Sequence, residues 1–591
     1  METKGKPAAS PAMTERVAFW AIAAFLVSGA LFHGFLLERE YLMASAAGAI
    51  LLLIMAVSGQ FKLRQQALFW ALVALAVSYG IAVLYAVTPG RAVHEALKSF
   101  IPLPIAVLGG FLSASAYRKL VCILLASASL TTILGLALGL FYEGRLAGLL
   151  DYANGLGILL FACAALGFPL YAVGRQWIYL PAAFLFALGI GLTQSRTVFA
   201  LGVLGAFVSL LGSRKHDRAA WMNYATVSLM GVAGAVSYGN SVWVFAITVL
   251  LVGLLIWYLP RITGRKLTLA AAVGGAFALV FAVISLSSGH LFRWASLSSN
   301  LTDLRTRLVY YEDGLAMIRD SVLTGYGGGA WAEWQYRYQS ADYYVAYLHN
   351  HALQTWLDAG LLGIGAFLAV AMLVAVNGIR AIKRSEDELR SFEIARLAAC
   401  IALWLQSLLD FTFSSPYLFA LFVFLGLRLK KDERQKGPAT KASLGWGRFP
   451  LAACCAIIAM LAGTAMLSQL YYERAIRAAG EERLADAVAY LDRSMAAGIY
   501  DDAAHERKAR LYYEGYMDRR DRAYLSVAST EINAALAVNP DQIWYRKLRS
   551  DIDWELGNRE QALAELERLA RDNPFRTNWL EELNAKRPPP D

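Results

Sequence analysis

Two histidines flank an asparagine in the stretch "YLHNHALQ", residues 347–354. A histidine such as His349 can take a proton or donate a hydrogen bond near neutral pH. A lone histidine more often satisfies a hydrogen bond inside a core, so both interpretations stand for this position. The chain holds only seven histidines, and this pair lies where the polar stretch 288–350 gives way to an apolar one. His349 is therefore a candidate general base, with Asn350 as its support.

Several arginines could hold a phosphate-bearing substrate near this histidine. They are Arg145 in "EGRLAGLLDYANGLG", Arg196 in "TQSRTVFAL", and Arg305 and Arg307 in "LTDLRTRLVYYEDGLAMIRD". Asn154 follows Arg145 at the start of an apolar segment, where a helix cap is the alternative role. For Arg196 the alternative is an anchor to lipid phosphate. Guanidinium groups bind pyrophosphate well, so the set favours departure of a pyrophosphate while a base takes a proton from an attacking hydroxyl.

A glycine-rich turn and a group of aromatic residues lie between these arginines and His349. Gly327 and Gly328 belong to "TGYGGGAW", and backbone N–H groups in such a turn can cradle phosphate. The Lys-Ser/Thr of a nucleotide-binding loop is missing. Aromatic rings suit the headgroup zone of a membrane and can also stack on sugars; we expect mainly anchoring at the membrane interface. They are Trp331, Trp334, Tyr336, Tyr338, Tyr343, Tyr344 and Tyr347.

Long apolar segments must position these groups. The chain is 58% hydrophobic and 17% charged, whereas soluble domains carry about 25% charged residues. Many segments are long enough for a helix to cross about 30 Å of hydrocarbon. The sequence predicts an all-α, polytopic membrane protein with about 14–15 spans. The predicted spans are 17–37, 41–58, 67–88, 99–116, 119–140, 153–173, 177–194, 197–212, 222–239, 241–259, 267–287, 352–377, 394–411, 415–428 and 449–468.

The distribution of basic residues predicts the orientation. The net charge of +10 comes mostly from clusters in alternate short loops, which is typical of a topology signal and not of nucleic-acid binding. This places the segment 1–16 in the cytoplasm, and the loop 288–350 and the tail 469–591 outside it. The transmembrane parts are then 17–287 and 351–468. The five cysteines lie in apolar segments without metal-ligand spacing, so we expect no metal and no cofactor.

The tail has the pattern of a helical repeat. Pro540 and Pro574 are 34 residues apart, and Gly557 lies between two helical segments with small residues at their expected crossing. This is the tetratricopeptide period. Such repeats usually bind a partner, although a solvated spacer is the alternative.

Taken together, the motifs resemble those of the O-antigen ligase and O-antigen polymerase superfamily, bacterial membrane glycosyltransferases that include O-oligosaccharyltransferase-like members. The resemblance rests on "RLAGLLDYANGLG", "SRT", "RLVYYEDGLAMIRDSVLTGYGGG" and "HNHALQTWLDAGLLG". It implies an undecaprenyl-pyrophosphate-linked glycan donor, inversion at the anomeric carbon and no metal. It also implies that His349, Arg196 and Arg307 are catalytic, and that Arg145 binds substrate. We assign Asn154, Arg305, Asn350, Gly327 and Gly328 to substrate binding as well.

Other functions stay open at the level of sequence. The protein could join lipid-linked repeat units as a polymerase, or it could transfer glycan to a glycan, protein or cell-envelope acceptor. A different glycosyltransferase type would use an acid in the first outer loop, where Glu38 and Glu40 are the candidates. A lipid-glycan flippase or transporter is a further alternative. Such proteins tend to carry ionisable groups at mid-membrane, and these segments have almost none.

Overall fold

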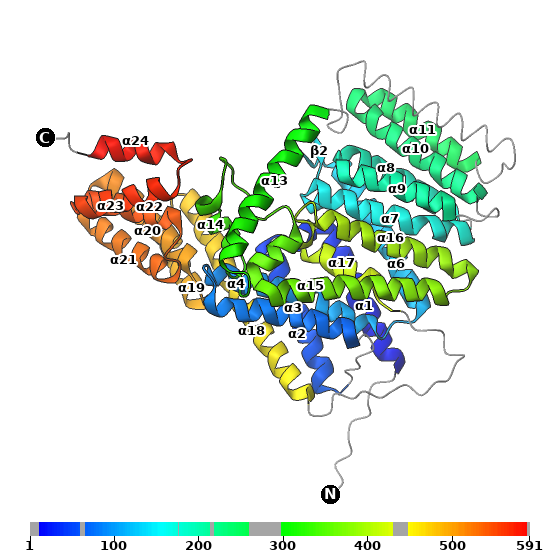
Figure 1. Ribbon diagram of the computed structural model, residues 1–591, viewed down its shortest axis with the longest axis horizontal. Helices are drawn as coiled ribbons and strands as arrows, with labels where there is room; N and C mark the ends of the chain where they lie inside the picture. The colour runs from blue at the N-terminus through cyan, green and yellow to red at the C-terminus, as the bar shows by residue number, and fades with distance from the viewer. Residues whose placement is uncertain are drawn as a thin grey trace, which may run out of the picture.

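The computed structural model describes residues 11–59, 66–174, 176–212, 218–258, 297–428 and 447–587. Figure 1 shows a bundle of long helices joined to a separate stack of shorter helices near the C-terminus, with α13 and α14 between them. Within the described residues every element is helical except a pair of two-residue strands, β1 (Phe141–Tyr142) and β2 (Arg145–Leu146). The prediction of an all-α membrane protein is confirmed, with this strand pair as a local departure.

The bundle is built from helices, most of them apolar, that pack on one another around a continuous core. Its first part contains α1 (Pro11–Leu31), α2 (Glu38–Val57), α3 (Gln66–Ala82), α4 (Pro89–Phe100), α5 (Pro102–Gly109), α6 (Ala114–Ala137), α7 (Ala153–Gly174), α8 (Tyr179–Thr193), α9 (Arg196–Gly212), α10 (Arg218–Asn240) and α11 (Val242–Tyr258). Its second part contains α15 (His351–Arg384), α16 (Asp387–Ser407), α17 (Pro416–Leu425) and α18 (Arg448–Gly480). Helices that are apolar on all sides are typical of membrane spans.

Eight helical segments among the described residues are long and apolar enough to cross a membrane. They are Met13–Leu31, Glu38–Val57, Gln66–Tyr85, Pro89–Gly109, Ala114–Ala137, Ala153–Val173, His351–Arg384 and Arg448–Gly480. The predicted spans 177–194, 241–259 and 415–428 correspond to shorter apolar helices, α8, α11 and α17. The predicted span 267–287 lies outside the described residues. The protein is therefore a multi-pass membrane protein, and the count of 14–15 spans stays a prediction.

Two helices differ from the predicted spans because of single residues. The predicted span 99–116 covers the end of α4, all of α5 and the start of α6, and α4 gives way to α5 at Pro102, which has no N–H to continue the helix. α15 is interrupted at Gly360 (φ 63°, ψ −159°), where the N–H of Leu361 donates to the carbonyl of Leu323. A Cβ at Gly360 would lie 2.1 Å from that carbonyl oxygen. The break therefore allows the segment 323–327 to pack against α15. This contact fixes the polar segment before α15 relative to the N-terminus of that helix.

The polar segment before α15 folds into α13 (Leu297–Asp320) and α14 (Ala330–Tyr338). Its aromatic residues form a small core of their own around Trp331, which is fully buried. Tyr336 instead packs with Ile543 and Trp579 of the tail. The expectation that these rings mainly anchor the protein at the membrane interface is wrong for these two residues. Trp331 is buried inside the loop, and Tyr336 is buried against the tail. Tyr344 remains exposed.

The tail is a stack of antiparallel helices that continues from α18. It contains α19 (Leu484–Ala497), α20 (Asp502–Arg519), α21 (Arg522–Val538), α22 (Ile543–Leu556), α23 (Arg559–Asp572) and α24 (Thr577–Lys586). Gly557 adopts φ 93° in the turn between α22 and α23, the left-handed conformation that glycine accepts at a helix end. α18 runs without interruption past residue 468, so the predicted start of the tail falls inside a helix.

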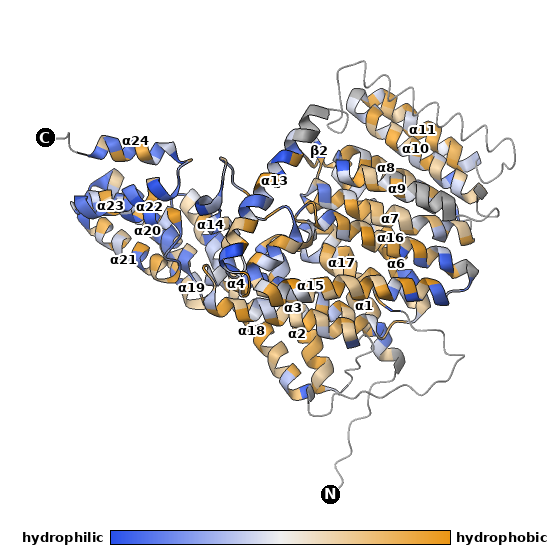
Figure 2. Ribbon diagram, viewed as in Figure 1, coloured by the Kyte–Doolittle hydropathy of each residue, from blue (hydrophilic) through white to orange (hydrophobic). Residues whose placement is uncertain are grey.

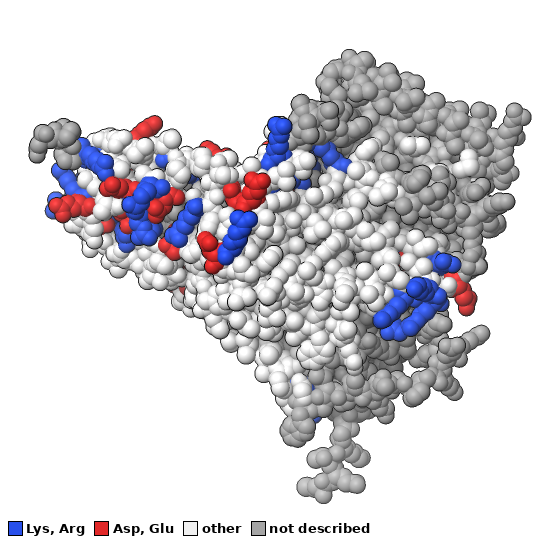
Figure 3. Space-filling model, in the orientation of Figure 1, with Lys and Arg blue, Asp and Glu red and all other residues white. Residues whose placement is uncertain are grey.

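Hydropathy and charge divide the surface in the same way. Figure 2 shows apolar residues along most of the bundle and hydrophilic ones over α13, α14 and the tail. In Figure 3 the charged side chains of the visible face gather over the tail and the α13–α14 region and at the opposite end of the bundle near the end of α15. The wide uncharged area between them is typical of a surface that faces lipid.

Candidate functional site

His349 lies two residues before the start of α15, and several groups hold it in place. Its Nδ1 lies 2.8 Å from Oδ1 of the fully buried Asp410. The hydroxyl of Tyr311 donates to the backbone carbonyl of His349 at 2.7 Å. The ring of Tyr310 stacks on the imidazole with 5.8 Å between centroids. The His349 side chain stays 23% exposed, so with Nδ1–H donated to the carboxylate, Nε2 is the nitrogen left to take a proton.

Asp410 lies in the short connection between α16 and α17, after the end of α16 and before the start of α17. Its Oδ1 also accepts the N–H of Phe411 at 2.9 Å, and its Oδ2 accepts from the side-chain amide of Asn154. Burial opposes ionisation of Asp410, but the hydrogen bond and charge of His349 and the charge of Arg307 outweigh it and lower the pKa of Asp410 to about 2. Asp410 is therefore an anion that orients His349 and can stabilise a positive charge on it.

Arg145 extends this network from the strand pair. Glu143 and Gly144 both have positive φ (49° and 73°), as a tight two-residue hairpin turn requires. Directly after this turn, Arg145 Nη2 donates to Oδ1 of Asn154 at 2.5 Å, and its Nε donates to the carbonyl of Thr193 at 2.9 Å. The hairpin thereby ties the start of α7 to the end of α8. Arg145 is linked to Asp410 through a single residue, Asn154.

The remaining predicted cations lie on α9 and α13. Arg196, the first residue of α9, donates from Nη1 to Oδ2 of Asp303 at 2.8 Å and is 22% exposed. One helical turn after Asp303, Arg307 donates from Nη1 to the carbonyl of Leu409, the residue before Asp410. α13 therefore carries one positive group to the His349 pair and joins Arg196 to the same helix. Arg305 is exposed, and within the described part of the chain it makes no hydrogen bond or ion pair.

The structure thus brings together four of the predicted site residues around one carboxylate: His349, Arg307, Asn154 and Arg145. An imidazole beside a buried anion can accept a proton from a hydroxyl. Guanidinium groups within one network can neutralise a departing pyrophosphate.

Asn350 has a local structural role. It adopts an extended conformation (φ −154°, ψ 106°) and its side-chain oxygen accepts the N–H groups of Ala352 and Leu353 at 3.0 and 3.1 Å. It is the N-cap of α15. Whether it also touches a substrate stays a prediction, but capping explains its position beside His349.

The glycine turn serves close packing. The N–H of Gly327 donates to the carbonyl of Asp358 at 2.9 Å, so this group is already engaged within the protein. A Cβ at Gly327 would lie 2.3 Å from the Cβ of Ala86, and one at Gly328 would lie 2.4 Å from the Cβ of Glu95. The structure requires glycine there because the turn lies directly against α4 and the residues before it. Their assignment to phosphate binding has no support from this geometry and stays untested.

Two acidic residues of the site were not assigned to it from the sequence. Asp410 appeared as one acid in the short segment "DFTFSSPY" between apolar stretches, and a charge flanked so closely by apolar spans was the available signal. The other is Asp303, two residues before Arg305. Its contact with Arg196 joins residues 107 positions apart, which no local pattern reveals.

No group of three or more His, Cys, Asp or Glu side chains in the described part of the chain is arranged to hold a metal ion. The candidate site accordingly contains one histidine and one carboxylate in contact, surrounded by arginines and amides.

Comparison with known protein families places these residues in context. No curated protein matches the chain. The family model described as O-Antigen ligase matches residues 225–368, which include Arg305, Arg307 and His349. Arg145 and Asp410 lie outside the matched residues but join the network around His349 in space, whereas Arg196, also outside them, pairs with Asp303 of α13. Residues 225–368 of this multi-pass membrane protein thus form an O-antigen ligase family domain.

Proposed function

We propose that the protein transfers a glycan from an undecaprenyl-pyrophosphate donor to the hydroxyl of an acceptor, without a metal and with inversion at the anomeric carbon. The observation that carries this proposal is the contact of His349 with the buried, ionised Asp410 inside a network that includes Arg145 and Arg307. The O-antigen ligase family domain supports the class of donor. A glycan, a protein or a cell-envelope component can serve as acceptor in this proposal.

The chemical step follows from the orientation of His349. Nε2 takes the proton of the acceptor hydroxyl as that oxygen attacks the anomeric carbon. The bond between this carbon and the pyrophosphate oxygen breaks, and its electron pair leaves with undecaprenyl pyrophosphate. The imidazolium that forms is stabilised by Asp410 through Nδ1. The proton is later released to solvent, and no oxidant or cofactor enters the balance.

The arginines act on the leaving group. Arg307 lies closest to the His349–Asp410 pair, since it donates to the residue before Asp410. Arg145 is supplied by the hairpin and Arg196 by α9. Hydrogen bonds to neighbouring residues fix the side chain of each arginine. Preorganised cations of this kind stabilise the charge that develops on a departing pyrophosphate.

The proposed location is the bacterial inner membrane, with the N-terminus cytoplasmic. The charged end of the bundle that includes Arg380, Lys383 and Arg384 of α15 would be cytoplasmic. α13, α14, His349 and the tail would lie outside the cytoplasm, where the polyprenyl-linked donor would be consumed. The orientation can be tested by placing a single cysteine at residue 342 or at residue 384. A thiol reagent that cannot cross the membrane of intact cells should label residue 342 and not residue 384.

The function is tested with purified full-length protein in nanodiscs, a synthetic undecaprenyl-pyrophosphate glycan and candidate acceptors. We expect His349→Ala to abolish transfer while the protein inserts and elutes normally. His505→Ala, which alters a histidine paired with Glu531 in the tail, is the matched control and should keep activity. Near-normal transfer by His349→Ala would overturn the assignment. A product in which one lipid-linked unit has been joined to another would identify a polymerase instead of a ligase.

A further inference from the structure

The backbone on both sides of His349 is held by groups that the proposed mechanism does not use. The N–H of Asn350 donates to the carbonyl of Leu348, so His349 lies at the centre of a three-residue turn. The side chain of Leu348 is fully buried against α13, where a Cβ at Gly314 would lie 2.7 Å from its Cδ2. The direction of the His349 side chain therefore depends on how Leu348 is held.

Gln354, in the first turn of α15, holds the backbone of Leu348. Its Oε1 accepts the N–H of Leu348 at 2.8 Å. Gln354 is only 2% exposed, and a buried N–H that loses its partner is costly. The helix that follows His349 thus supplies the acceptor for the N–H group that precedes it.

Asp358 determines the orientation of the Gln354 amide. The Nε2 of Gln354 donates to Oδ1 of Asp358 at 2.9 Å, one turn further along α15. The N–H of Leu348 can only donate, whereas the oxygen of Asp358 accepts. The amide oxygen must therefore face Leu348 and the amide nitrogen must face Asp358, because only this orientation satisfies both neighbours.

Asp358 is itself fixed by the fold. It is 1% exposed, and its Oδ2 accepts from the hydroxyl of Tyr79 of α3 at 3.4 Å. Its backbone carbonyl accepts the N–H of Gly327 at 2.9 Å, and this carbonyl is left free by the interruption of α15 at Gly360. A buried acid in an apolar helix is costly and is usually retained for a partner. Here the partner is the amide of Gln354.

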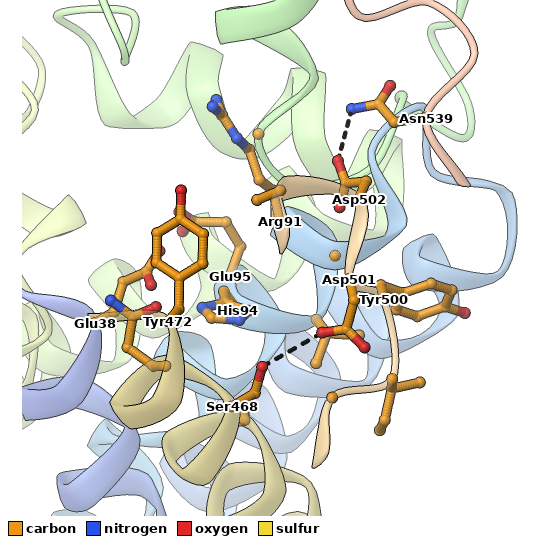
Figure 4. A pocket seen from close by; sticks show the side chains of 18 of the residues that line it. Glu38, Arg91, His94, Glu95, Ser468, Tyr472, Tyr500, Asp501, Asp502 and Asn539 are labelled. Carbon is orange, nitrogen blue, oxygen red and sulfur yellow. Dashed lines mark hydrogen bonds between the residues drawn. The ribbon is translucent and has the colours of Figure 1, made fainter. Parts of the chain in front are cut away.

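Tyr347 fixes the same segment independently, on the side of α4. A cavity of about 570 Å³ lies between α4, α18 and the tail, and Figure 4 shows among its lining residues Glu95, Asp501 and Asp502. Tyr347 also lines this cavity, and its hydroxyl donates to Glu95 at 3.0 Å and accepts from Lys98 at 2.9 Å. The chain is therefore held just before Leu348, and a change further upstream should not reach His349.

We propose that Gln354 is a positioning residue for catalysis by His349, and that Asp358 holds the Gln354 amide in the orientation that this requires. The inference rests on the proposed glycan transfer, in which His349 is the base. With the N–H of Leu348 bound, the turn directs the imidazole toward Asp410 and keeps Nε2 in place for the acceptor hydroxyl. Without the amide, the turn shifts to pair its N–H elsewhere, and even a small shift takes the base out of its reactive geometry.

Three variants of the full-length protein in nanodiscs test this role. Gln354→Met keeps the length of the side chain and removes both hydrogen bonds. Gln354→Glu/Asp358→Asn, the exchanged pair, lets a carboxylate accept the N–H of Leu348 and lets an amide donate to that carboxylate, so the chain of contacts is retained. Gln335→Met is the matched control. Gln335 is fully buried in α14, and its Oε1 accepts the N–H of Val345 at 3.0 Å.

We expect Gln354→Met to lower kcat at least about tenfold while KM for the donor stays within about twofold, because the base is displaced and the arginines are not. The exchanged pair should keep kcat within about threefold of the wild type, since its hydrogen bonds remain. Gln335→Met should also keep kcat, because Tyr347 holds the chain between Val345 and His349. Thermal unfolding verifies that each variant is folded.

A second measurement needs no glycan transfer. With isotope-labelled histidine, nuclear magnetic resonance detects the Nδ1–H proton of His349, and its absence from His349→Ala assigns it. The hydrogen bond to Asp410 should place this resonance downfield in the wild type, in the exchanged pair and in Gln335→Met. In Gln354→Met it should move upfield or disappear.

Unchanged kcat in folded Gln354→Met would overturn the proposal, as would an equal loss of kcat in the exchanged pair or in Gln335→Met. An unchanged Nδ1–H resonance in Gln354→Met would do the same. If Gln354→Met does not fold, the exchanged pair decides, and loss of its activity or of its resonance overturns the proposal. If the wild type transfers no glycan, the proposed function fails, and the resonance alone decides whether Gln354 positions His349.

Discussion

Replacement of Asp410 by asparagine is the most informative perturbation of the candidate site. Asp410 touches His349 through Oδ1 and Asn154 through Oδ2 and is fully buried. Asp410→Asn keeps the shape of the side chain but removes its charge. It also offers an amide N–H group that can turn toward Nδ1 of His349, which would favour the tautomer with the proton on Nε2. Both effects weaken His349 as a base without altering the histidine.

The magnitude follows from the pKa of Asp410. Its pKa falls from 3.8 to about 2 in the folded protein, which corresponds to about 2 kcal/mol in favour of the ionised form. Because the pKa is lowered by folding, this contribution to stability is present above pH 4 and is lost as the pH falls toward 2. If the same interaction stabilises the imidazolium in the transition state, its loss lowers kcat at least about thirtyfold.

The assay is initial-rate glycan transfer in nanodiscs over a range of pH. The rate of Asp410→Asn should fall as stated at every pH at which the variant stays folded. Asp342→Asn, which removes an exposed carboxylate from the polar segment before His349, is the control and should behave as the wild type. Size-exclusion chromatography and unfolding curves identify any loss due to folding.

A double-variant cycle gives the decisive result. If Asp410 acts through His349, replacing both residues costs no more than His349→Ala alone. Independent, multiplying losses would refute the coupling between them. So would an Asp410→Asn protein that is folded and retains more than half of the wild-type rate.

Three further outcomes follow from single contacts. Arg196→Lys should reduce transfer about tenfold or more, measured as kcat/KM, because an ammonium cannot reproduce a bidentate guanidinium contact with pyrophosphate; an unchanged rate would remove Arg196 from the site. Asn350→Ala should lower the free energy of unfolding by about 1 kcal/mol through loss of the cap of α15, and Asn350→Ser should restore most of it in the same melting experiment. Gly360→Ala should lower the yield of folded protein sharply, since its Cβ would meet the carbonyl of Leu323 at 2.1 Å, whereas Gly365→Ala in open space should not; equal melting temperatures would contradict the docking of the loop on the break.

Local sequence patterns were sufficient for the class of fold and for part of the site. Apolar length predicted most helices of the bundle, since a membrane span must satisfy its own backbone. The helical ends were less predictable. Pro102 and Gly360 divide two elements, because one missing N–H and one close carbonyl override a continuous apolar pattern. α18 likewise joins the membrane segment to the tail without any change in helix geometry at residue 468.

The aromatic loop shows why burial could not be predicted from composition. Trp331 and Tyr336 have amphipathic side chains that suit either a membrane interface or a core. The choice depends on which surfaces lie opposite them. Trp331 packs in the core of the loop itself, and Tyr336 packs against Ile543 in the tail, far later in the chain. Sequence spacing holds no information on such a contact.

The sequence by itself determined an all-helical membrane protein, a histidine at a polar boundary and a set of scarce arginines, because residue type and apolar length are local properties. Only the tertiary structure decided that His349 meets Asp410, 61 residues later, and that Arg145 reaches this pair through Asn154. It also decided that the tail closes a carboxylate-lined cavity against α4. These contacts form between segments that are distant along the chain, and their energies depend on burial and on opposing charges that only the packed helices supply.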